Sequence, residues 1–352
     1  MTRASFTGER LTSRASLALR SYGIVVALVI LVVIIAFIHP SFLAFGNLMN
    51  IVSQWSPVAI MGIGMTYVVI TGGFDLSIGA VYTLCAVIAA SVGRTQAPII
   101  AFALAITVGL LAGVVNGLVV TALRVNAFIA TLGTQLIITG MTLVLTGNVA
   151  FIVTFDQFKV LGSGRAFGVP YSGMLMLALM IIGGLVLAYT PYGQAIYAVG
   201  GNREASRLAG IPTSTTVWSS YALAGFCAGI AGSVSASQLS SAQANLNPSI
   251  VFDVLTVVIV GGTLLTGGSG AIWRTAVGVG ILASLQNGFN LLNVSPYYQD
   301  IIKGIIVIAA IARVDWRRLI GPRLDREARS ELPEPSPTKH SEITPSLSKE
   351  TP

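Results

Sequence analysis

Charged residues are scarce in this sequence, and acidic residues are the scarcest inside it. Only 9% of the 352 residues are Asp, Glu, Lys or Arg, whereas 54% are hydrophobic. A soluble domain carries roughly 25% charged residues, so this composition excludes an ordinary soluble fold and is typical of a polytopic membrane protein. Between residues 21 and 312 the acidic residues are Asp75, Asp156, Glu204, Asp253 and Asp300.

Other absences exclude whole classes of chemistry. The two histidines, His39 and His340, exclude a histidine-rich metal centre and a Ser-His-Asp constellation within the membrane. The sequence contains no GxxxxGK[ST] phosphate-binding loop, so we expect no ATP hydrolysis of the P-loop kind in this chain. Cys85 and Cys227 lie in apolar runs without CxxC spacing, which favours buried thiols over a disulfide or a metal site. We therefore predict a protein that is not an enzyme, holds no metal or cofactor, and takes its energy from a partner.

Apolar runs divide the chain into candidate membrane spans. A helix needs about 20 apolar residues to cross about 30 Å of hydrocarbon. The sequence predicts an all-α polytopic membrane protein with about 10 transmembrane helices, and eight remain possible because the shorter runs could be re-entrant. The segments are 23–39, 50–71, 77–93, 98–121, 126–146, 172–190, 215–238, 250–266, 271–292 and 297–314.

Positive charge flanks these spans at both ends of the chain. The net charge of +7 can suggest a nucleic-acid partner, but basic residues cluster before the first apolar run and after the last one. These are Arg3, Arg10, Arg14 and Arg20, and Arg313, Arg317, Arg318 and Arg323. The positive-inside rule places such residues in the cytoplasm, so we expect both termini there and no nucleic-acid binding. We predict a basic cytoplasmic arm (1–22), a transmembrane domain (23–314) and a proline-rich, disordered cytoplasmic tail (315–352). A cleaved signal peptide is the minority alternative for the first run.

A polar segment, the loop 191–214, separates two long apolar blocks and is expected on the cytoplasmic side. It predicts a short helix with Asn202 as N-cap, Glu204 in the first turn, Arg207 near the end and Gly210 as the stop. One face of this helix is small and apolar, which suits docking into a groove of another protein. That face consists of Ala205, Leu208 and Ala209.

Asp75, in TGGFDLSIG, is the most informative acid. A carboxylate beside apolar spans is costly unless it faces protein, water or a helix end. Two interpretations remain open: Asp75 and Ser77 cap the helix that starts near Leu76, or Asp75 acts on substrate or gating, and one residue can do both.

Two segments echo each other, TYVVITGGFDLSIGAVYTL from Thr66 and LTVVIVGGTLLTGGSGAIWRT from Leu255. In each segment a Gly-Gly pair interrupts an apolar stretch, which then resumes. Duplicated, interrupted segments in the two halves of a membrane protein indicate a pathway at their interface.

Polar residues within the spans are the remaining candidates for a pathway. Buried amides must be hydrogen-bonded, so each one either joins helices or lines a wet path. Gln286, Asn287 and Asn290 form a stripe that suits a neutral polyol better than an ion. Asp253 is read either as a helix-start acid or as part of a polar mouth that receives substrate. The candidate pathway residues are Asp75, Ser77, Asn116, Thr131, Gln135, Asp253, Gln286, Asn287 and Asn290.

Five blocks in this order resemble the permease subunits of bacterial ABC sugar importers, the ribose-permease-like family. The resemblance covers about residues 51–312. The blocks are GMTYVVITGGFDLSIGA (64–80), NGLVVTALRVNAFIATLGT (116–134), YGQAIYAVGGNREASRLAGI (192–211), VVIVGGTLLTGGSGAIWRT (257–275) and QNGFNLLNVSPYYQDIIKGIIVIAA (286–310).

The resemblance implies a multi-pass protein of the bacterial inner membrane that carries a monosaccharide such as ribose, xylose or galactose. It implies three protein partners: a cytoplasmic ATPase subunit that binds ATP and Mg, a periplasmic sugar-binding protein, and a second permease, identical or paralogous. It also implies that the ATPase binds the segment formed by Gly200, Gly201, Asn202, Arg203, Glu204, Ala205 and Arg207.

The rival interpretations are a branched-chain amino-acid permease of similar layout and an ion-coupled carrier. Gly200–Asn202 favours the sugar permeases over the first, and the scarcity of ionisable residues within the spans argues against the second. We expect replacement of Gly201 or Glu204 to uncouple ATP hydrolysis from uptake.

Overall fold

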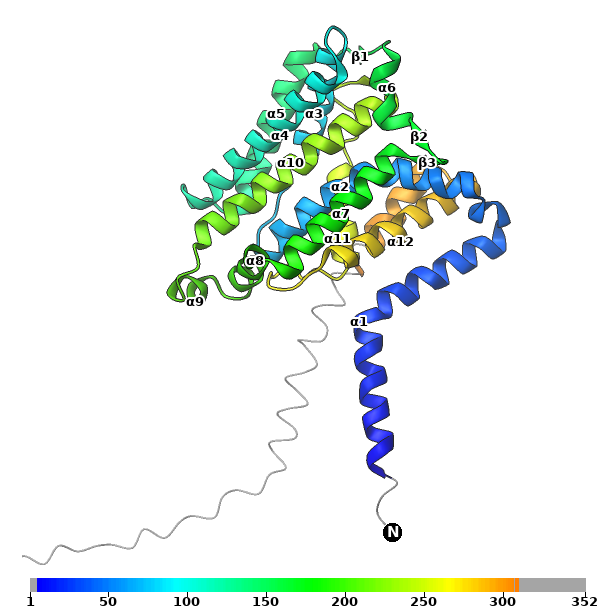
Figure 1. The fold of residues 1–352 in the computed structure, drawn as a ribbon, viewed down its shortest axis with the longest axis vertical. Coiled ribbons are helices and arrows are strands. Elements are labelled where there is room, and N and C mark those ends of the chain that lie inside the picture. Colours follow the sequence, from blue (N-terminus) through cyan, green and yellow to red (C-terminus); the bar gives the residue numbers. More distant parts are fainter. Residues whose placement is uncertain (1–4, 307, 310–352) are drawn as a thin grey trace, which may run out of the picture. The chain divides into compact units, whose positions relative to one another are not determined.

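The computed structural model describes residues 5–306 and 308–309, which form a bundle of helices (Figure 1). The predicted tail 315–352 and the end of the last predicted span lie outside the described residues. The helices are α1 (Ser5–Ile38), η1 (Pro40–Leu43), α2 (Phe45–Ile70), α3 (Ile78–Gly93), α4 (Pro98–Thr121), α5 (Ala127–Thr146), α6 (Asp156–Ser163), α7 (Tyr171–Tyr189), α8 (Pro191–Gly201), α9 (Arg203–Leu208), α10 (Thr213–Leu239), α11 (Ile250–Val260) and α12 (Ile272–Leu291). Residues 296–306 are also helical.

Every predicted span coincides with a helix, so the all-α polytopic prediction is confirmed. Within the described residues, α4, α5, α7 and α10 are each long and apolar enough to cross a membrane, and shorter apolar helices accompany them. The count of ten spans and the cytoplasmic placement of the termini stay predictions.

Three boundaries differ from the sequence prediction. Helix α1 extends from Ser5 to Ile38 and so begins within the predicted basic arm (1–22), whose cytoplasmic placement stays a prediction. Helix α11 ends at Val260, six residues before the predicted end of its span at 266, because Gly262 adopts the left-handed conformation that terminates it. With 11 residues, α11 is about 16 Å long, roughly half the hydrocarbon thickness. The polar loop 191–214 contains two helices, α8 and α9, rather than one.

The segment between α5 and α7 is partly folded onto the bundle. Two short antiparallel pairs occur there: β1 (Phe151–Ile152) with β4 (Ser241–Ala242), and β2 (Arg165–Ala166) with β3 (Val169–Pro170). The Ser237 hydroxyl on α10 donates a hydrogen bond to the carbonyl of Phe158 and accepts one from the N–H of Gly162 at 2.8 Å. Phe158 is consequently buried, and α6 closes one end of the bundle.

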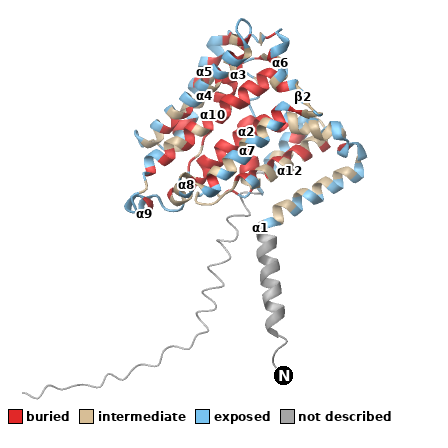
Figure 2. Cartoon of the chain, in the orientation of Figure 1, coloured by how far each residue is buried: buried red, intermediate tan, exposed pale blue. Residues whose placement is uncertain are grey.

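Helix α10 is the most buried of the long helices and forms the centre of the bundle (Figure 2). It packs against α4 with almost no side chain between the two backbones: a Cβ added at Gly113 would collide with the carbonyl of Tyr221, and one added at Gly225 with that of Gly109. Small residues spaced four apart permit such close approach in membranes. The spacing of four between Gly109 and Gly113, and between Gly225 and Gly229, is therefore explained by helix packing.

Candidate coupling and translocation sites

Helix α9 has the geometry that its sequence predicts. The side-chain oxygen of Asn202 accepts a hydrogen bond from the N–H of Ala205 at 2.9 Å, and Glu204 pairs with Arg207 at 2.6 Å. Hydrogen bonds from the guanidinium of Arg207 hold the pKa of Glu204 below its ordinary value, so its carboxylate is charged at neutral pH. Leu208 is 74% exposed. The helix thus presents an apolar tip beside a paired charge, and whether it docks on an ATPase stays a prediction.

At the end of α8, directly before α9, the backbone packs against the backbone of other segments with no side chain between them. A Cβ added at Gly200 would collide with the carbonyl oxygen of Ile70 at the end of α2. The same carbonyl accepts a hydrogen bond from the N–H of Gly268 at 2.8 Å. A Cβ added at Gly267 would lie 2.8 Å from the carbonyl of Gly200 and 3.0 Å from the N–H of Gly72. We call this contact of Ile70, Gly72, Gly200, Gly267 and Gly268 the glycine junction.

The glycine junction brings together the two segments that echo each other in sequence. Helices α2 and α11 end in the same way, with left-handed glycines at Gly72 and Gly262. In both, the second N–H past the helix cap bonds back to the third helical carbonyl from the end, Gly73 to Val68 at 3.0 Å and Thr263 to Val258 at 3.2 Å. The turns that follow α2 and α11 therefore pack against each other, with Gly73 and Thr263 buried and Gly72 and Gly262 exposed.

Four candidate pathway residues from three parts of the chain meet in one buried cluster, which we call the Asp75 cluster. A side-chain oxygen of Asp75 accepts hydrogen bonds from the N–H of Ser77 at 3.0 Å and from its hydroxyl at 2.6 Å. The amide of Asn116, on α4, donates to the Ser77 hydroxyl at 2.6 Å, and the Thr131 hydroxyl, on α5, accepts from the N–H of Leu76 at 3.1 Å. Asp75 is 1% exposed. Asp75 thus closes a turn onto Ser77 directly before α3, while no side-chain hydrogen bond caps the first turn of α3 itself. Both interpretations of Asp75, cap and role in transport, stay predictions.

One side of the Asp75 cluster is covered by Tyr221 of α10, whose hydroxyl donates to the carbonyl of Phe74 at 3.0 Å. The side-chain oxygen of Asn116 is buried and has no hydrogen-bond partner among the described residues. A buried acceptor without a donor is costly, and such an atom marks a place where a water or a substrate hydroxyl binds favourably.

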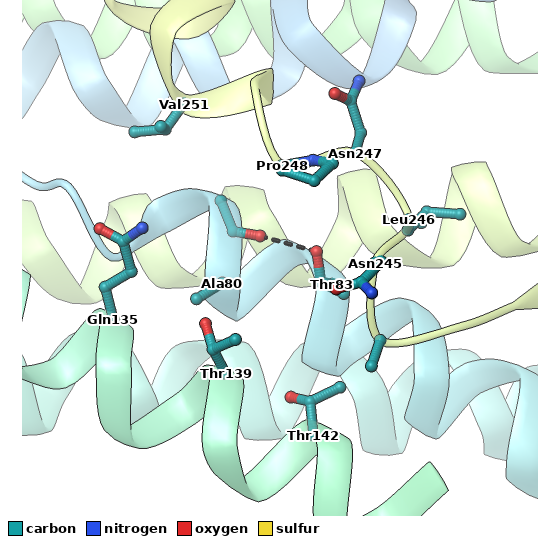
Figure 3. A pocket seen from close by; sticks show the side chains of 12 residues that line it. Ala80, Thr83, Gln135, Thr139, Thr142, Asn245, Leu246, Asn247, Pro248 and Val251 are labelled. Carbon is teal, nitrogen blue, oxygen red and sulfur yellow. Dashed lines mark hydrogen bonds between the residues drawn. The ribbon is translucent and has the colours of Figure 1, made fainter. Parts of the chain in front are cut away.

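Gln135 lies in a separate cavity of about 140 Å³, which we call the Gln135 cavity (Figure 3). Gln135 and Thr139 point from α5 toward α3, and Asn245 lies near Thr83. No charged side chain is among the residues that line it. The lining residues are Gly79, Ala80, Thr83, Gln135, Thr139, Thr142, Ala244, Asn245, Leu246, Asn247, Pro248 and Val251.

A second and larger polar cavity, about 580 Å³, adjoins α9, and we call it the Arg124 cavity. It is lined by Arg124 in the turn between α4 and α5, by Arg203 and Arg207 on α9, and by Gly72 and Tyr221 from the interior. The arginines of α9 therefore face the rest of the chain as well as solvent.

The remaining candidates lie elsewhere and bond to other elements. Asp253 pairs with Lys303 at 3.1 Å, which joins α11 to the helix 296–306. Asn287 exchanges two amide hydrogen bonds with Asn47, at 2.9 and 3.1 Å, and Asn290 accepts from Gln299 at 3.0 Å. Gln286 is half-buried. None of the four lines either cavity among the described residues, so the predicted stripe on α12 is occupied by contacts between helices.

Sequence reasoning missed several residues of these sites. Thr139 lies one helical turn after Gln135, a spacing of four that the sequence displays. Tyr221 and Tyr197 give no such signal, because an aromatic residue in an apolar run usually indicates core. The Tyr197 hydroxyl donates to the carbonyl of Gly270 at 2.7 Å and so holds α8 against the loop after α11.

We expect Asp75→Asn to leave the protein folded, because asparagine keeps the side-chain oxygen that accepts from Ser77. Asp75→Ala removes that acceptor and leaves the Ser77 donors buried, which costs roughly 1–3 kcal/mol. Thermal unfolding of the detergent-solubilised protein measures the difference. Equal melting temperatures for the two variants would contradict a capping role, and normal uptake by Asp75→Asn would exclude a role for the charge.

Comparisons with known proteins agree with this architecture. Residues 47–311 match the family described as "Branched-chain amino acid transport system / permease component". The chain is 39% identical to the ribose import permease protein RbsC of Escherichia coli K12, over 88% of this chain and 98% of that protein. It is 37% identical to RbsC of Bacillus subtilis 168 (83% and 92%) and 34% identical to the L-arabinose transport system permease protein AraH of E. coli K12 (82% and 89%).

No solved structure matches the chain. The family match and the relatives each extend over most of the sequence, and the described helices include several that suit a bilayer. The chain therefore belongs to this family of bacterial ABC-importer permeases, as the ribose-permease resemblance predicted, and is a multi-pass protein of the inner membrane.

Proposed function

We propose that this chain is the membrane-spanning subunit of an ABC importer that moves a neutral monosaccharide into the cytoplasm. The observation that carries the proposal is the Gln135 cavity, a polar cavity lined by amides and hydroxyls without a charged side chain. Amides and hydroxyls donate and accept hydrogen bonds, which matches the alternating donors and acceptors of a polyol. The relatives named for ribose and L-arabinose support the same class of cargo.

The energy for this movement is proposed to come from a separate ATPase subunit that binds ATP and Mg. Helix α9 is a surface element with an exposed apolar tip, and its neighbour α8 touches the ends of both repeats at the glycine junction. In this proposal a displacement of α9 is transmitted to α2 and to the loop before α12 through contacts between backbone atoms, with no flexible side chain between them. A periplasmic sugar-binding protein and a second permease copy complete the proposed importer.

A branched-chain amino acid is the second candidate cargo, because the family description names it. Its ammonium and carboxylate groups require charged partners or helix ends. The Gln135 cavity offers no charged side chain, which favours sugar. An ion-coupled carrier is less compatible, because Asp253, one of the few acids among the spans, is paired with Lys303.

Uptake into right-side-out vesicles, with the binding protein outside and ATP inside, tests the function directly. We expect ATP-dependent uptake of one labelled pentose or hexose when the chain is co-expressed with the ATPase and binding protein encoded beside it. Uptake of leucine or valine instead would select the amino-acid alternative. Uptake driven by an ion gradient without the ATPase would overturn the proposal.

Gly200→Ala should uncouple ATP hydrolysis from sugar uptake, because its Cβ forces apart α8 and the end of α2. Gly201→Ala is the matched control, since a Cβ there meets no atom within 4 Å. The structure thus moves the expected constraint from Gly201 to its neighbour.

The ratio of sugar transported to ATP hydrolysed, measured in proteoliposomes, separates the two variants. The account predicts a large loss for Gly200→Ala and a nearly normal ratio for Gly201→Ala. The reverse pattern would mean that this segment acts through a contact with the ATPase and not through the glycine junction.

A further inference from the structure

Two segments that are distant in the sequence bring arginines to one cavity. Arg124 lies in the turn between α4 and α5, Arg203 and Arg207 lie on α9, and all three line the Arg124 cavity. The positive-inside rule accounts for arginines beside membrane spans, but it does not require them to converge. Like charges around one cavity repel each other, so an anion placed between them is favoured.

The positive charge of the Arg124 cavity is only partly neutralised by the protein. Arg207 pairs with Glu204 at 2.6 Å. Among the described residues, no ion pair includes Arg124 or Arg203. The residues that line the cavity include no acid, and the buried Asp75 is not among them. The cavity therefore keeps an excess of positive charge.

The starts of two helices add to this charge. Helix α10 begins at Thr213 and α5 begins at Ala127, and both residues line the Arg124 cavity. The first N–H groups of a helix have no acceptor within the helix, and they attract anions. Within the described part of the chain, no side chain caps the first turn of α10. Its N–H groups are thus available to the oxygens of a ligand.

The size and polarity of the cavity suit a small organic anion. Its volume of about 580 Å³ lies within the range of roughly 300–1,000 Å³ that is typical of small-molecule sites. Ser214 and Asn126 are among its polar lining residues and offer hydrogen bonds to hydroxyl groups. Val217 and Tyr221, which are both buried, line its inner side.

We propose that the Arg124 cavity binds a small ligand that carries a phosphate group, and that this ligand joins α9 to the turn between α4 and α5. A guanidinium group matches two oxygens of a phosphate in a planar fork. Because a phosphate has more oxygens than a carboxylate, it can bond to Arg124 and to Arg203 at the same time. A soluble sugar phosphate and the headgroup of a phospholipid both supply this chemistry.

The bound phosphate restrains α9, because it replaces repulsion between the arginines by attraction to one shared group. Helix α9 is the segment proposed to contact the ATPase. Occupation of the Arg124 cavity is therefore a means by which an anion changes transport without binding where the sugar binds. The site itself does not depend on the cargo, since it is formed by residues outside the Gln135 cavity.

Binding is measured on the full-length chain in an uncharged detergent, at constant ionic strength. Equilibrium dialysis with radiolabelled ribose 5-phosphate gives the affinity, and inorganic phosphate and ribose are the competitors. Arg124→Gln removes one charge from the cavity. Arg94→Gln is the matched control, because Arg94 is exposed, lies over the ring of Phe151 and is not among the residues that line the cavity.

We expect the wild type and Arg94→Gln to bind ribose 5-phosphate equally, and Arg124→Gln to bind it at least several-fold more weakly. Inorganic phosphate should compete and ribose should not. Arg124→Lys keeps the charge but loses the planar fork, so its affinity should be intermediate; it also replaces Arg124→Gln if that variant fails to fold. Equal binding by the wild type and both Arg124 variants would overturn the proposal.

A second arm distinguishes the two sources of phosphate. The chain is reconstituted in nanodiscs that contain phosphatidylglycerol or only phosphatidylcholine, and the lipids that it retains are identified by native mass spectrometry. Retention of phosphatidylglycerol that is lost in Arg124→Gln, without binding of ribose 5-phosphate, would assign the site to a lipid headgroup.

If neither phosphate compound binds in a way that depends on Arg124, the proposal is wrong. Loss of a co-expressed ATPase from Arg124→Gln under those conditions would show that the cavity receives an acidic side chain of that subunit instead. Sugar uptake is not used in either arm, so failure of this site leaves the proposed function intact.

Discussion

Non-helical backbone inside a membrane protein must find its hydrogen-bond partners within the protein. The turns after α2 and after α11 are non-helical backbone that is partly buried, and they lie against each other and against the end of α8. The N–H of Gly268 donates a hydrogen bond to the carbonyl of Ile70, and the contact at Gly200 leaves no room for a side chain. Three segments therefore share one close contact, and we propose that they move together.

In the proposed mechanism, this contact makes α9 and the interior of the bundle one mechanical unit. Helix α9 is exposed, while α8 is anchored by the glycine junction and by the bond from Tyr197 to Gly270. The short loop from Gly72 to Ser77 then carries any displacement to the Asp75 cluster. In this account the chain performs no chemistry of its own and converts movement at one surface into opening at depth.

Much of the fold follows from the sequence, because hydrophobic runs and caps are local signals. Each of the ten predicted segments overlaps a helix in the part of the chain that the structure describes, and the sequence predicted the Asn202 cap and the positions of Glu204 and Arg207 on α9. The packing of residues 151–170 could not be predicted from the sequence, because it depends on hydrogen bonds of Phe158 and Gly162 with Ser237, which is distant in the sequence. For the same reason the sequence could not show which candidate residues lie together. Those that form the Asp75 cluster were predicted one by one, and Asn287 and Asn290, which bond to other elements, were predicted beside them. Amides that join helices and amides that line a cavity look alike until their partners are known.

The most direct test of the mechanical unit is a distance measured in each nucleotide state. Spin labels at Leu208 and Thr266, both exposed, report the separation of α9 from the loop before α12, and a pair at Leu208 and Gln96 reports α9 against the far end of α3. The account predicts that the first distance stays constant between the nucleotide-free and ATP-bound importer while the second changes. A first distance that changes as much as the second would show that α9 moves without the glycine junction, and would contradict the account.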